Sequence, residues 1–258
     1  MSNIPPSSSS TGLDAVAWVR RWDRQQAGYI PDREQTFALM LDVLERLSAA
    51  PGRLLDLACG PGSLSDRTIA RFRNAEVVGL DLDPVMLELG RRTLGDRVQW
   101  IEADLRSPDW TQRLSTVKFD AVVSATALHW LDAGHLPHVS EGLAALLRSG
   151  GVFLDYDTLL ADPATPRMAA LMKDLRQALE KPTISAEDFE DFYAWWESLS
   201  LEPELRELFA ERDRRFGPKR HGAGSTLSEW ERALGAAGFT EIATLTQVMD
   251  RRLLVAIR

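Results

Sequence analysis

The sequence lacks the features on which membrane-spanning and disulfide-bonded proteins depend. Its 258 residues include a single cysteine, so no disulfide can form within the chain. No apolar run approaches the length of about eighteen residues that a membrane-spanning helix requires. The first twelve residues are rich in Ser and Pro, and they lack the apolar core of a signal peptide. We therefore expect a disordered tail over residues 1–12, a cytoplasmic location and no membrane partner.

Basic residues are outnumbered by acidic ones, and histidines are few. The chain carries 30 basic against 38 acidic side chains, a formal net charge of -8 that repels polyanions, so nucleic acid is not an expected partner. The densest basic stretch, residues 212–220, has acidic neighbours, and we interpret it as a solvated surface segment. The four histidines, His129, His135, His138 and His221, lack Cys or carboxylate neighbours at ligand spacing, so no metal site is predicted.

From residue 53 onward, short β-rich segments alternate with longer amphipathic segments. This alternation is typical of an α/β fold in which helices cover both faces of a parallel sheet. Buried strands are predicted at residues 53–58, 76–81, 98–103, 119–125 and 151–156. Helices are predicted at residues 63–73, 84–93, 138–148 and 226–237. Two alternating runs at residues 239–248 and 251–258 predict a C-terminal β-hairpin.

The same pattern predicts the domain organisation. Residues 13–48 contain two predicted helices in front of the first strand, which we interpret as an N-terminal helical cap. Residues 158–225 carry helical but no β signal, and we expect a helical insertion that covers the carboxyl edge of the sheet as a substrate cap. Residues 49–157 and 226–258 then form one α/β core that binds the cofactor.

The sharpest local signal is a strand–turn–helix segment at residues 54–62, with the sequence LLDLACGPG. The glycines at positions 60 and 62 let a ligand approach the backbone closely. Asp81 follows about twenty residues later at the end of the second predicted strand, where an acid accepts hydrogen bonds from ribose hydroxyls. These features together predict a cofactor that contains a nucleoside.

Three further positions distinguish between nucleoside cofactors. Ser65 occupies the third small position of the dinucleotide fingerprint, where Gly or Ala favours a pyrophosphate, so NAD is disfavoured although it stays open. Asp56 lies within the strand before the turn, where a carboxylate suits the ammonium and sulfonium charges of S-adenosylmethionine better than a pyrophosphate. Asp104 and Leu105 follow the third strand and offer adenine a carboxylate and a backbone N–H.

These motifs give residues 53–157 a resemblance to the class I S-adenosylmethionine-dependent methyltransferases. The matching segments are residues 56–62 (DLACGPG), 79–81 (GLD), 102–105 (EADL) and 119–124 (FDAVVS). The resemblance implies a doubly wound, Rossmann-like sheet of seven mostly parallel strands, with the antiparallel hairpin at its end and a helical cap. It implies S-adenosyl-L-methionine as cofactor, bound by Asp56, Ala58, Cys59, Gly60, Gly62, Asp81, Leu82, Met86, Asp104, Leu105 and Ser124.

The loop after the fourth strand, residues 124–131, should face the transferred methyl group. Trp130 in this loop resembles a tryptophan of the carboxyl methyltransferases, including trans-aconitate, juvenile hormone acid and salicylate-type enzymes, that helps hold the acceptor carboxylate. The segment with Gln26 and Tyr29 resembles their N-terminal caps, in which a glutamine or tyrosine closes over the acceptor. Two neighbouring tryptophans, Trp195 and Trp196, fit either the core of the cap or the wall of a substrate pocket.

The acceptor chemistry determines what His129 does. A carboxylate acceptor is already ionised at neutral pH, so it needs positioning more than a base. A phenol or alcohol must lose a proton, and His129 is then the candidate base, unless it only forms a hydrogen bond near the loop.

We therefore predict an enzyme that methylates a small molecule, foremost an oxygen of a carboxylate. The alternatives are a hydroxyl- or amine-bearing natural product, or methylation of a carbon atom or a protein. An NAD-dependent oxidoreductase and a cofactor-binding protein without catalysis are alternatives of another class. The sequence leaves the oligomeric state open.

Overall fold

A computed structural model describes residues 12–30, 32–48, 51–114, 116–179, 190–217 and 224–258. Within them, seven strands form one sheet in the order β3-β2-β1-β4-β5-β7-β6. The strands are β1 (Arg53–Leu57), β2 (Glu76–Asp81), β3 (Val98–Glu102), β4 (Phe119–Ala125), β5 (Leu147–Thr158), β6 (Glu241–Val248) and β7 (Arg251–Ile257). Strands β1 to β5 pair in parallel, whereas β7 is antiparallel to both β5 and β6. The predicted fold class is confirmed.

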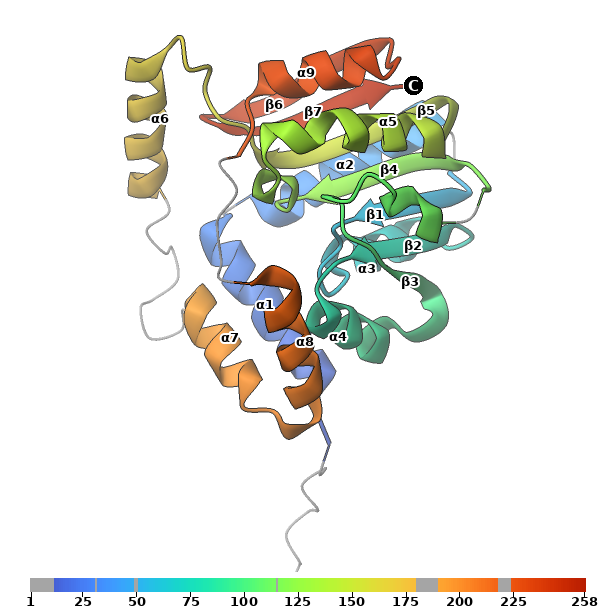
Figure 1. Cartoon of the computed structure of the whole chain (residues 1–258), viewed down its shortest axis with the longest axis vertical. Helices are drawn as coiled ribbons and strands as arrows, with labels where there is room; N and C mark the ends of the chain where they lie inside the picture. The colour runs from blue at the N-terminus through green and yellow to red at the C-terminus, as the bar shows by residue number, and fades with distance from the viewer. Residues whose placement is uncertain (1–11, 31, 49–50, 115, 180–189, 218–223) are drawn as a thin grey trace, which may run out of the picture.

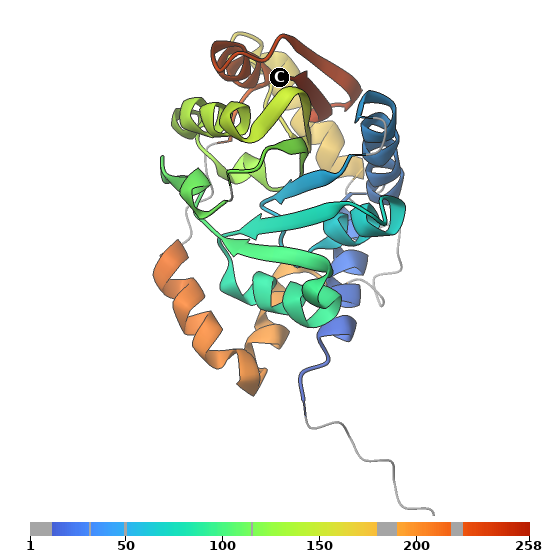
Figure 2. The same cartoon turned by 90° about the vertical axis from the view of Figure 1, so that its right-hand side faces the viewer.

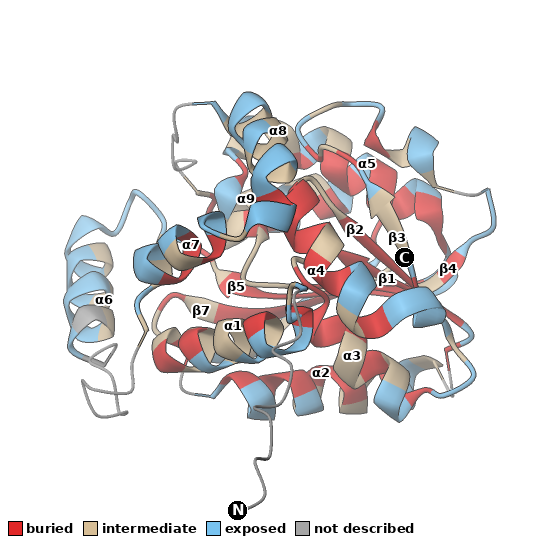
Figure 3. Cartoon of the chain, turned by 90° about the horizontal axis from the view of Figure 1, so that it is seen from below, coloured by how far each residue is buried: buried red, intermediate tan, exposed pale blue. Residues whose placement is uncertain are grey.

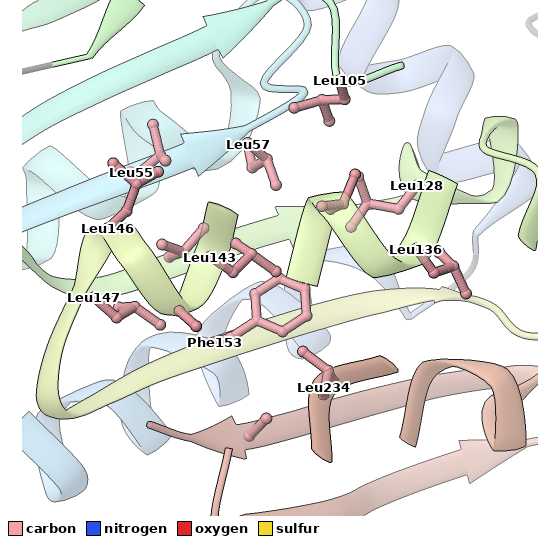
Figure 4. Packing of buried hydrophobic residues seen from close by; sticks show 14 of the residues in the cluster. Leu55, Leu57, Leu105, Leu128, Leu136, Leu143, Leu146, Leu147, Phe153 and Leu234 are labelled. Atoms are coloured by element: carbon pink, nitrogen blue, oxygen red, sulfur yellow. The ribbon is translucent and has the colours of Figure 1, made fainter. Parts of the chain in front are cut away.

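Helices cover both faces of the sheet because each strand exposes an apolar face that must be buried (Figure 1). Helices α2 (Arg33–Ser48) and α3 (Ser63–Arg71) pack on one face, around Leu44, Leu54 and Leu64. Helices α5 (Leu136–Leu146) and α9 (Leu227–Ala236) pack on the other. In that second layer, leucines of α5, Leu234 of α9 and Phe153 of β5 interdigitate (Figure 4). The two layers hold the loops at the strand ends in fixed positions.

A third apolar cluster joins three helices of the cap to the core. Helices α1 (Ala15–Tyr29), α7 (Phe192–Ser200) and α8 (Arg206–Phe216) pack with α4 (Pro84–Leu94) through residues such as Trp18, Met86, Leu89, Trp195 and Leu205. Helices α1, α7 and α8 lie on the side toward which the strand arrowheads point in Figure 1, and they stand below the strands in Figure 2. The segment 13–48 is divided between two places, since α1 belongs to this cluster while α2 lies on the sheet.

Helix α6 (Pro166–Leu179) stands apart from the other helices, and most of its described side chains are exposed (Figure 3). Its Arg176 donates a hydrogen bond of 2.7 Å to Asp250 of the turn between β6 and β7. None of the described helices is long and apolar enough to cross a bilayer.

The third predicted helix ends earlier than the sequence pattern indicates. The prediction continued it to residue 148, whereas α5 ends at Leu146 and the chain is extended from Leu147. Leu147 pairs with Phe119, and the register then shifts before Ala121 pairs with Val152. This strand pairing outweighs the helical spacing of the leucines, as tertiary contacts commonly override local propensity.

Candidate active site

A cavity of about 690 Å³ lies between the loops at the carboxyl ends of the parallel strands and the helices α1, α7 and α8. Its size falls within the range of about 300–1,000 Å³ typical of small-molecule sites. Ligands bind at this place in open parallel sheets, because the loops there leave a crevice. The cavity therefore collects the side chains that the sequence analysis assigned to different loops.

The turn after β1 forms the floor of the cavity. Gly60 has a φ of +55°, and its backbone N–H donates a hydrogen bond of 2.7 Å to Oδ2 of Asp81. Ala58, Cys59 and Gly60 all line the cavity. Gly62, which was predicted to bind the cofactor, is not among the lining residues; a Cβ there would lie 2.6 Å from the Trp100 ring. The absence of a side chain at Gly62 lets the Trp100 ring pack against the backbone there.

Asp81 is held by backbone donors from two loops. In addition to the N–H of Gly60, the N–H of Asp83 donates to Oδ1 of Asp81 over 2.8 Å. Burial raises the pKa of Asp81 to about 6. The carboxylate lines the cavity at the end of β2 and retains acceptor capacity, because each of its oxygens can accept more than one hydrogen bond. It can therefore bind neighbouring hydroxyls, as ribose presents them.

Asp56 places a second carboxyl group at the cavity, although almost none of its surface is exposed. Burial raises its pKa to about 7. The hydroxyl of Ser65 donates a hydrogen bond of 2.6 Å to Oδ2 of Asp56. Ser65, which the sequence analysis used as an argument against NAD, thus has a specific partner in this fold. A cationic ligand group beside Asp56 would favour the charged form of this carboxyl.

The loops after β2 and β3 complete the cofactor end of the cavity. Leu82, Met86, Asp104 and Leu105, four of the residues predicted to bind the cofactor, all line it. Burial tends to raise the pKa of Asp104, but hydrogen bonds from Arg106 lower it below its ordinary value. Asp104 is therefore anionic at neutral pH and can accept a hydrogen bond from an amine.

Ser124, also predicted to contact the cofactor, does not line the cavity. The residue is fully buried in β4, where it pairs with Asp155 of β5. The lining begins one residue later, at Ala125, where β4 ends and the loop at the carboxyl end of the sheet starts.

His129 and Asp157 form the main polar pair at the other end of the cavity. The Nδ1 atom of His129 lies 2.6 Å from Oδ1 of Asp157, and the backbone N–H of His129 donates to Oδ2 over 2.9 Å. Burial tends to lower the pKa of His129, but the charge and hydrogen bond of Asp157 raise it above its ordinary value. Nε2 is left for a ligand, as a donor or an acceptor according to the protonation state.

Trp130 follows in the same 3-10 turn, Leu128–Trp130, and lines the cavity. It is 43% exposed, and its ring centroid lies 5.4 Å from that of His129. A large aromatic side chain left half-exposed at a cavity wall offers apolar contact area and an indole N–H to a ligand. The pair thus supplies positioning groups from one loop.

Of the predicted cap residues, Gln26, Tyr29 and Trp196 line the cavity, but Trp195 does not. Trp195 is fully buried among the cap helices, and its ring lies 4.9 Å from that of Trp22. Adjacent helical residues point about 100° apart, so one of two neighbouring tryptophans enters the core and the other faces the cavity.

The sequence pattern did not indicate the cationic side chains of the cavity. Arg33, Arg212 and Arg251 line it. The stretch interpreted as a solvated surface begins with Arg212, whose guanidinium instead is largely buried over the Trp196 ring, 3.8 Å from the centroid. The prediction was wrong for Arg212 because its partners come from distant parts of the chain. Asp157 was missed because it stands one residue beyond the predicted fifth strand.

Comparisons with known proteins agree with this geometry. Residues 54–151 match a family described as a methyltransferase domain. The chain is 34% identical over 137 residues to the trans-aconitate 2-methyltransferase of Streptomyces avermitilis, which covers 50% of this chain and 49% of that protein. It is 35% identical over 165 residues to the malonyl-acyl-carrier protein O-methyltransferase of Enterobacter lignolyticus, covering 64% of this chain and 57% of that protein. The chain thus spans about half the length of these curated relatives.

A solved structure extends the likeness to nearly the whole chain. The S-adenosylmethionine-bound CalS10, an amino pentose methyltransferase from Micromonospora echinaspora, matches with a TM-score of 0.55 at 21% identity. The match covers 97% of this chain and 99% of that one, so the two proteins share the fold from end to end.

Proposed function

Because this chain belongs to the class I S-adenosylmethionine-dependent methyltransferases, we propose that it methylates a small molecule, and specifically an oxygen of a carboxylate. The observation that carries the proposal is the half-exposed Trp130 beside the raised-pKa His129 on the loop after β4. An indole N–H and an imidazolium N–H are both donors, and a carboxylate accepts from both. The relatives described above are named for two acceptors, trans-aconitate and malonyl-acyl-carrier protein, and both acceptors carry carboxylates.

The residues at the floor of the cavity fit S-adenosylmethionine. Asp56 and Asp81 have pKa values raised by burial to about 7 and about 6, and a ligand with ammonium and sulfonium charges would favour their ionised forms. We assign Asp81 to the ribose hydroxyls, Asp104 with the backbone of Leu105 to adenine, and Asp56 to the ammonium group. When bound there, the cofactor supplies an electrophilic methyl group on a sulfonium.

At the acceptor end, the chain's own residues position the nucleophile. A carboxylate is already ionised at neutral pH, so no proton has to be removed before attack on the methyl group. Protonated His129 would donate from Nε2 to one carboxylate oxygen while Asp157 holds its Nδ1–H. Trp130 and the apolar walls would exclude water, and the loss of hydration would raise the reactivity of the other carboxylate oxygen. The hydrogen bond from His129 would keep that oxygen aligned with the methyl group.

The His129–Asp157 pair also favours a second candidate, an O-methyltransferase for a hydroxyl group. A buried carboxylate that holds Nδ1–H leaves Nε2 of neutral His129 as an acceptor, and such a histidine can serve as a general base. The two candidates therefore need His129 in opposite protonation states.

The chemical stability of the product tests the proposal. The purified protein would be incubated with methyl-labelled S-adenosylmethionine and matched pairs of carboxylic acids and phenols or alcohols. Mild alkali hydrolyses a methyl ester but leaves a methyl ether or methylamine intact. We expect alkali-labile label from the acids; alkali-stable label from the hydroxyl compounds alone would replace the proposal with the second candidate.

Trp130→Leu supplies the site control for this assay. We expect it to raise the KM for the acceptor while the affinity for S-adenosylhomocysteine stays within about twofold, since Trp130 lies at the acceptor end. Equal loss of both affinities would show that Trp130 does not act on the acceptor.

A further inference from the structure

Aromatic side chains are distributed unevenly around the cavity. The described loops after β1, β2 and β3 contribute aliphatic, polar and charged residues to its wall but no aromatic ones. The aromatic lining residues come instead from the cap helices, from α2 and from the turn after β4. They are Trp22, Tyr29, Phe37, Trp130, Phe192, Tyr193, Trp196 and Phe216. The two ends of one cavity therefore suit ligands of different chemistry.

Three of these rings form a continuous wall on the cap. The centroids of Trp22 and Phe192 lie 6.1 Å apart, and each of these rings lies 6.3 Å from Trp196. The planes meet at 55° to 75°, so one contact is tilted and two are edge to face, and the rings hold one another in place. Residues fixed in this way offer a pre-organised apolar surface that loses little entropy when a ligand packs on it.

The basic residues near this wall already have partners in the protein. Arg33 donates to Asp23 over 3.0 Å, and Arg212 donates to Asp83 over 2.6 Å. Arg251 donates to the backbone oxygen of Tyr29 over 2.8 Å. A ligand with several carboxylates would have to compete for these groups or bury uncompensated charge, which is costly. The Nε2–H of protonated His129 supplies a donor for one carboxylate.

We propose that the acceptor is a monocarboxylic acid with a flat, aromatic body, whose ring packs among Trp22, Phe192 and Trp196 while its carboxylate lies at His129 and Trp130. This inference rests on the proposed function. It separates the chain from its relative named for trans-aconitate, whose acceptor is a small polar tricarboxylate. An aromatic acid matches a wall built from aromatic edges and faces and requires a single anionic anchor.

Binding measurements in the presence of S-adenosylhomocysteine test the acceptor class without requiring turnover. Cinnamate and 2-naphthoate would be titrated by calorimetry against cyclohexanecarboxylate as the non-aromatic acid and trans-aconitate as the tricarboxylate. We expect the aromatic acids to bind about tenfold or more tightly than either comparison. Equal affinity for cyclohexanecarboxylate, or tighter binding of trans-aconitate, would overturn the inference.

A matched pair of variants locates the effect. Phe192→Leu removes one ring of the wall, whereas Phe72→Leu makes the same change in the core beneath α3, away from the cavity. We expect Phe192→Leu to reduce the preference for aromatic acids at least fivefold and Phe72→Leu to leave it unchanged. Loss of the preference in both variants, or in neither, contradicts the inference.

The failure of the aromatic class and the failure of the proposed function give different results. If aromatic acids bind no better than aliphatic ones but alkali-labile label still forms, the carboxylate function stands and the aromatic class is wrong. The other result is that phenols or aromatic amines bind and yield alkali-stable label while aromatic acids yield none. In that case both the carboxylate function and the monocarboxylic acid are wrong.

Discussion

Arg212 of α8 donates a hydrogen bond of 2.6 Å from Nε to Oδ2 of Asp83, the residue that caps α4 and follows the ribose-binding candidate Asp81 by two positions. The same guanidinium stacks on Trp196, which belongs to the aromatic wall. One side chain thus links the cap over the acceptor to the loop beside the cofactor. Because Arg212 contacts both ends of the cavity, we expect a change at one end to alter ligand affinity at the other.

Arg212→Gln should weaken the binding of both ligands. The variant leaves Asp83 buried without its charged partner and removes the cation from the Trp196 ring, so the cap loses its fixed position. We expect the Kd for S-adenosylhomocysteine to rise about tenfold, which corresponds to about 1.4 kcal/mol, and the thermal midpoint to fall. Calorimetric titration and thermal unfolding would measure the two effects.

Arg214→Gln is the matched control on the same helix. Arg214 is exposed and pairs with Glu211 within α8, so its loss should change neither the Kd nor the thermal midpoint measurably. A similar rise in Kd for both variants would mean that α8 contributes only its general charge, and the link from Arg212 to the cofactor loop would be refuted.

The cofactor end was predictable because its determinants are local. A strand, a glycine turn and an acid at the next strand end each occupy a few consecutive residues, and parallel strands bring their carboxyl ends together. Asp56 and Asp81 therefore reach one cavity without any knowledge of the cap. The exception is Gly62, where the same local pattern also serves the packing of Trp100, which lies almost forty residues away.

The acceptor end depends on contacts between distant segments. Arg212 and Asp83 are 129 residues apart, and the basic stretch around Arg212 carries no local sign of a buried partner. Whether Trp195 or Trp196 faces the cavity depends on how α7 is rotated against α1, and a helical period alone does not determine this rotation. The pairing of His129 with Asp157 required the register of β5 beyond its predicted end.

The affinity for the cofactor should depend on pH through the buried carboxyls. Asp81, with a pKa raised to about 6, must be ionised to accept hydrogen bonds from both ribose hydroxyls. Because the raised pKa values keep protons on the folded apo protein at low pH, the Kd for S-adenosylmethionine should rise about tenfold per pH unit for each carboxyl that must ionise. Between about pH 7 and 6 the proton released on binding should come mainly from Asp56, and below about pH 6 Asp81 should add a second proton and steepen the rise in Kd.

Calorimetry in buffers with different ionisation enthalpies measures this proton release directly. In Asp81→Asn the release should decrease and the affinity should be lower at all pH values, because the amide cannot replace a carboxylate that accepts from four donors. Proton uptake on binding in the wild-type protein would contradict the assignment of Asp56 and Asp81 to cofactor groups.

Gly60 and Gly62 should differ in what they support, although the sequence analysis grouped them. In Gly62→Ala the Cβ would lie 2.6 Å from Trp100, in a backbone with a φ of +86°, so we expect a loss of about 2–5 kcal/mol in unfolding free energy. At Gly60 nothing lies within 4 Å, and the strain of its φ alone costs about 1 kcal/mol. Denaturant unfolding would measure both.

The affinity for S-adenosylhomocysteine should show the reverse order. A methyl group at position 60 projects into the cavity, so Gly60→Ala should weaken binding more than Gly62→Ala does once both are measured well below their unfolding temperatures. If Gly62→Ala is as stable as the wild type but binds poorly, Gly62 is a cofactor residue after all and its packing role is secondary.

The pH dependence of methyl transfer distinguishes the two roles of His129. If imidazolium holds a carboxylate, the acceptor KM rises as pH increases through the raised pKa of His129; if neutral His129 is a base, kcat rises instead. Asp157→Asn removes the charge that raises this pKa, so either profile should shift to lower pH. Asp96→Asn is the control, because Asp96 is exposed and does not line the cavity, so it should shift nothing. Equal shifts in both variants would mean that Asp157 does not act through His129.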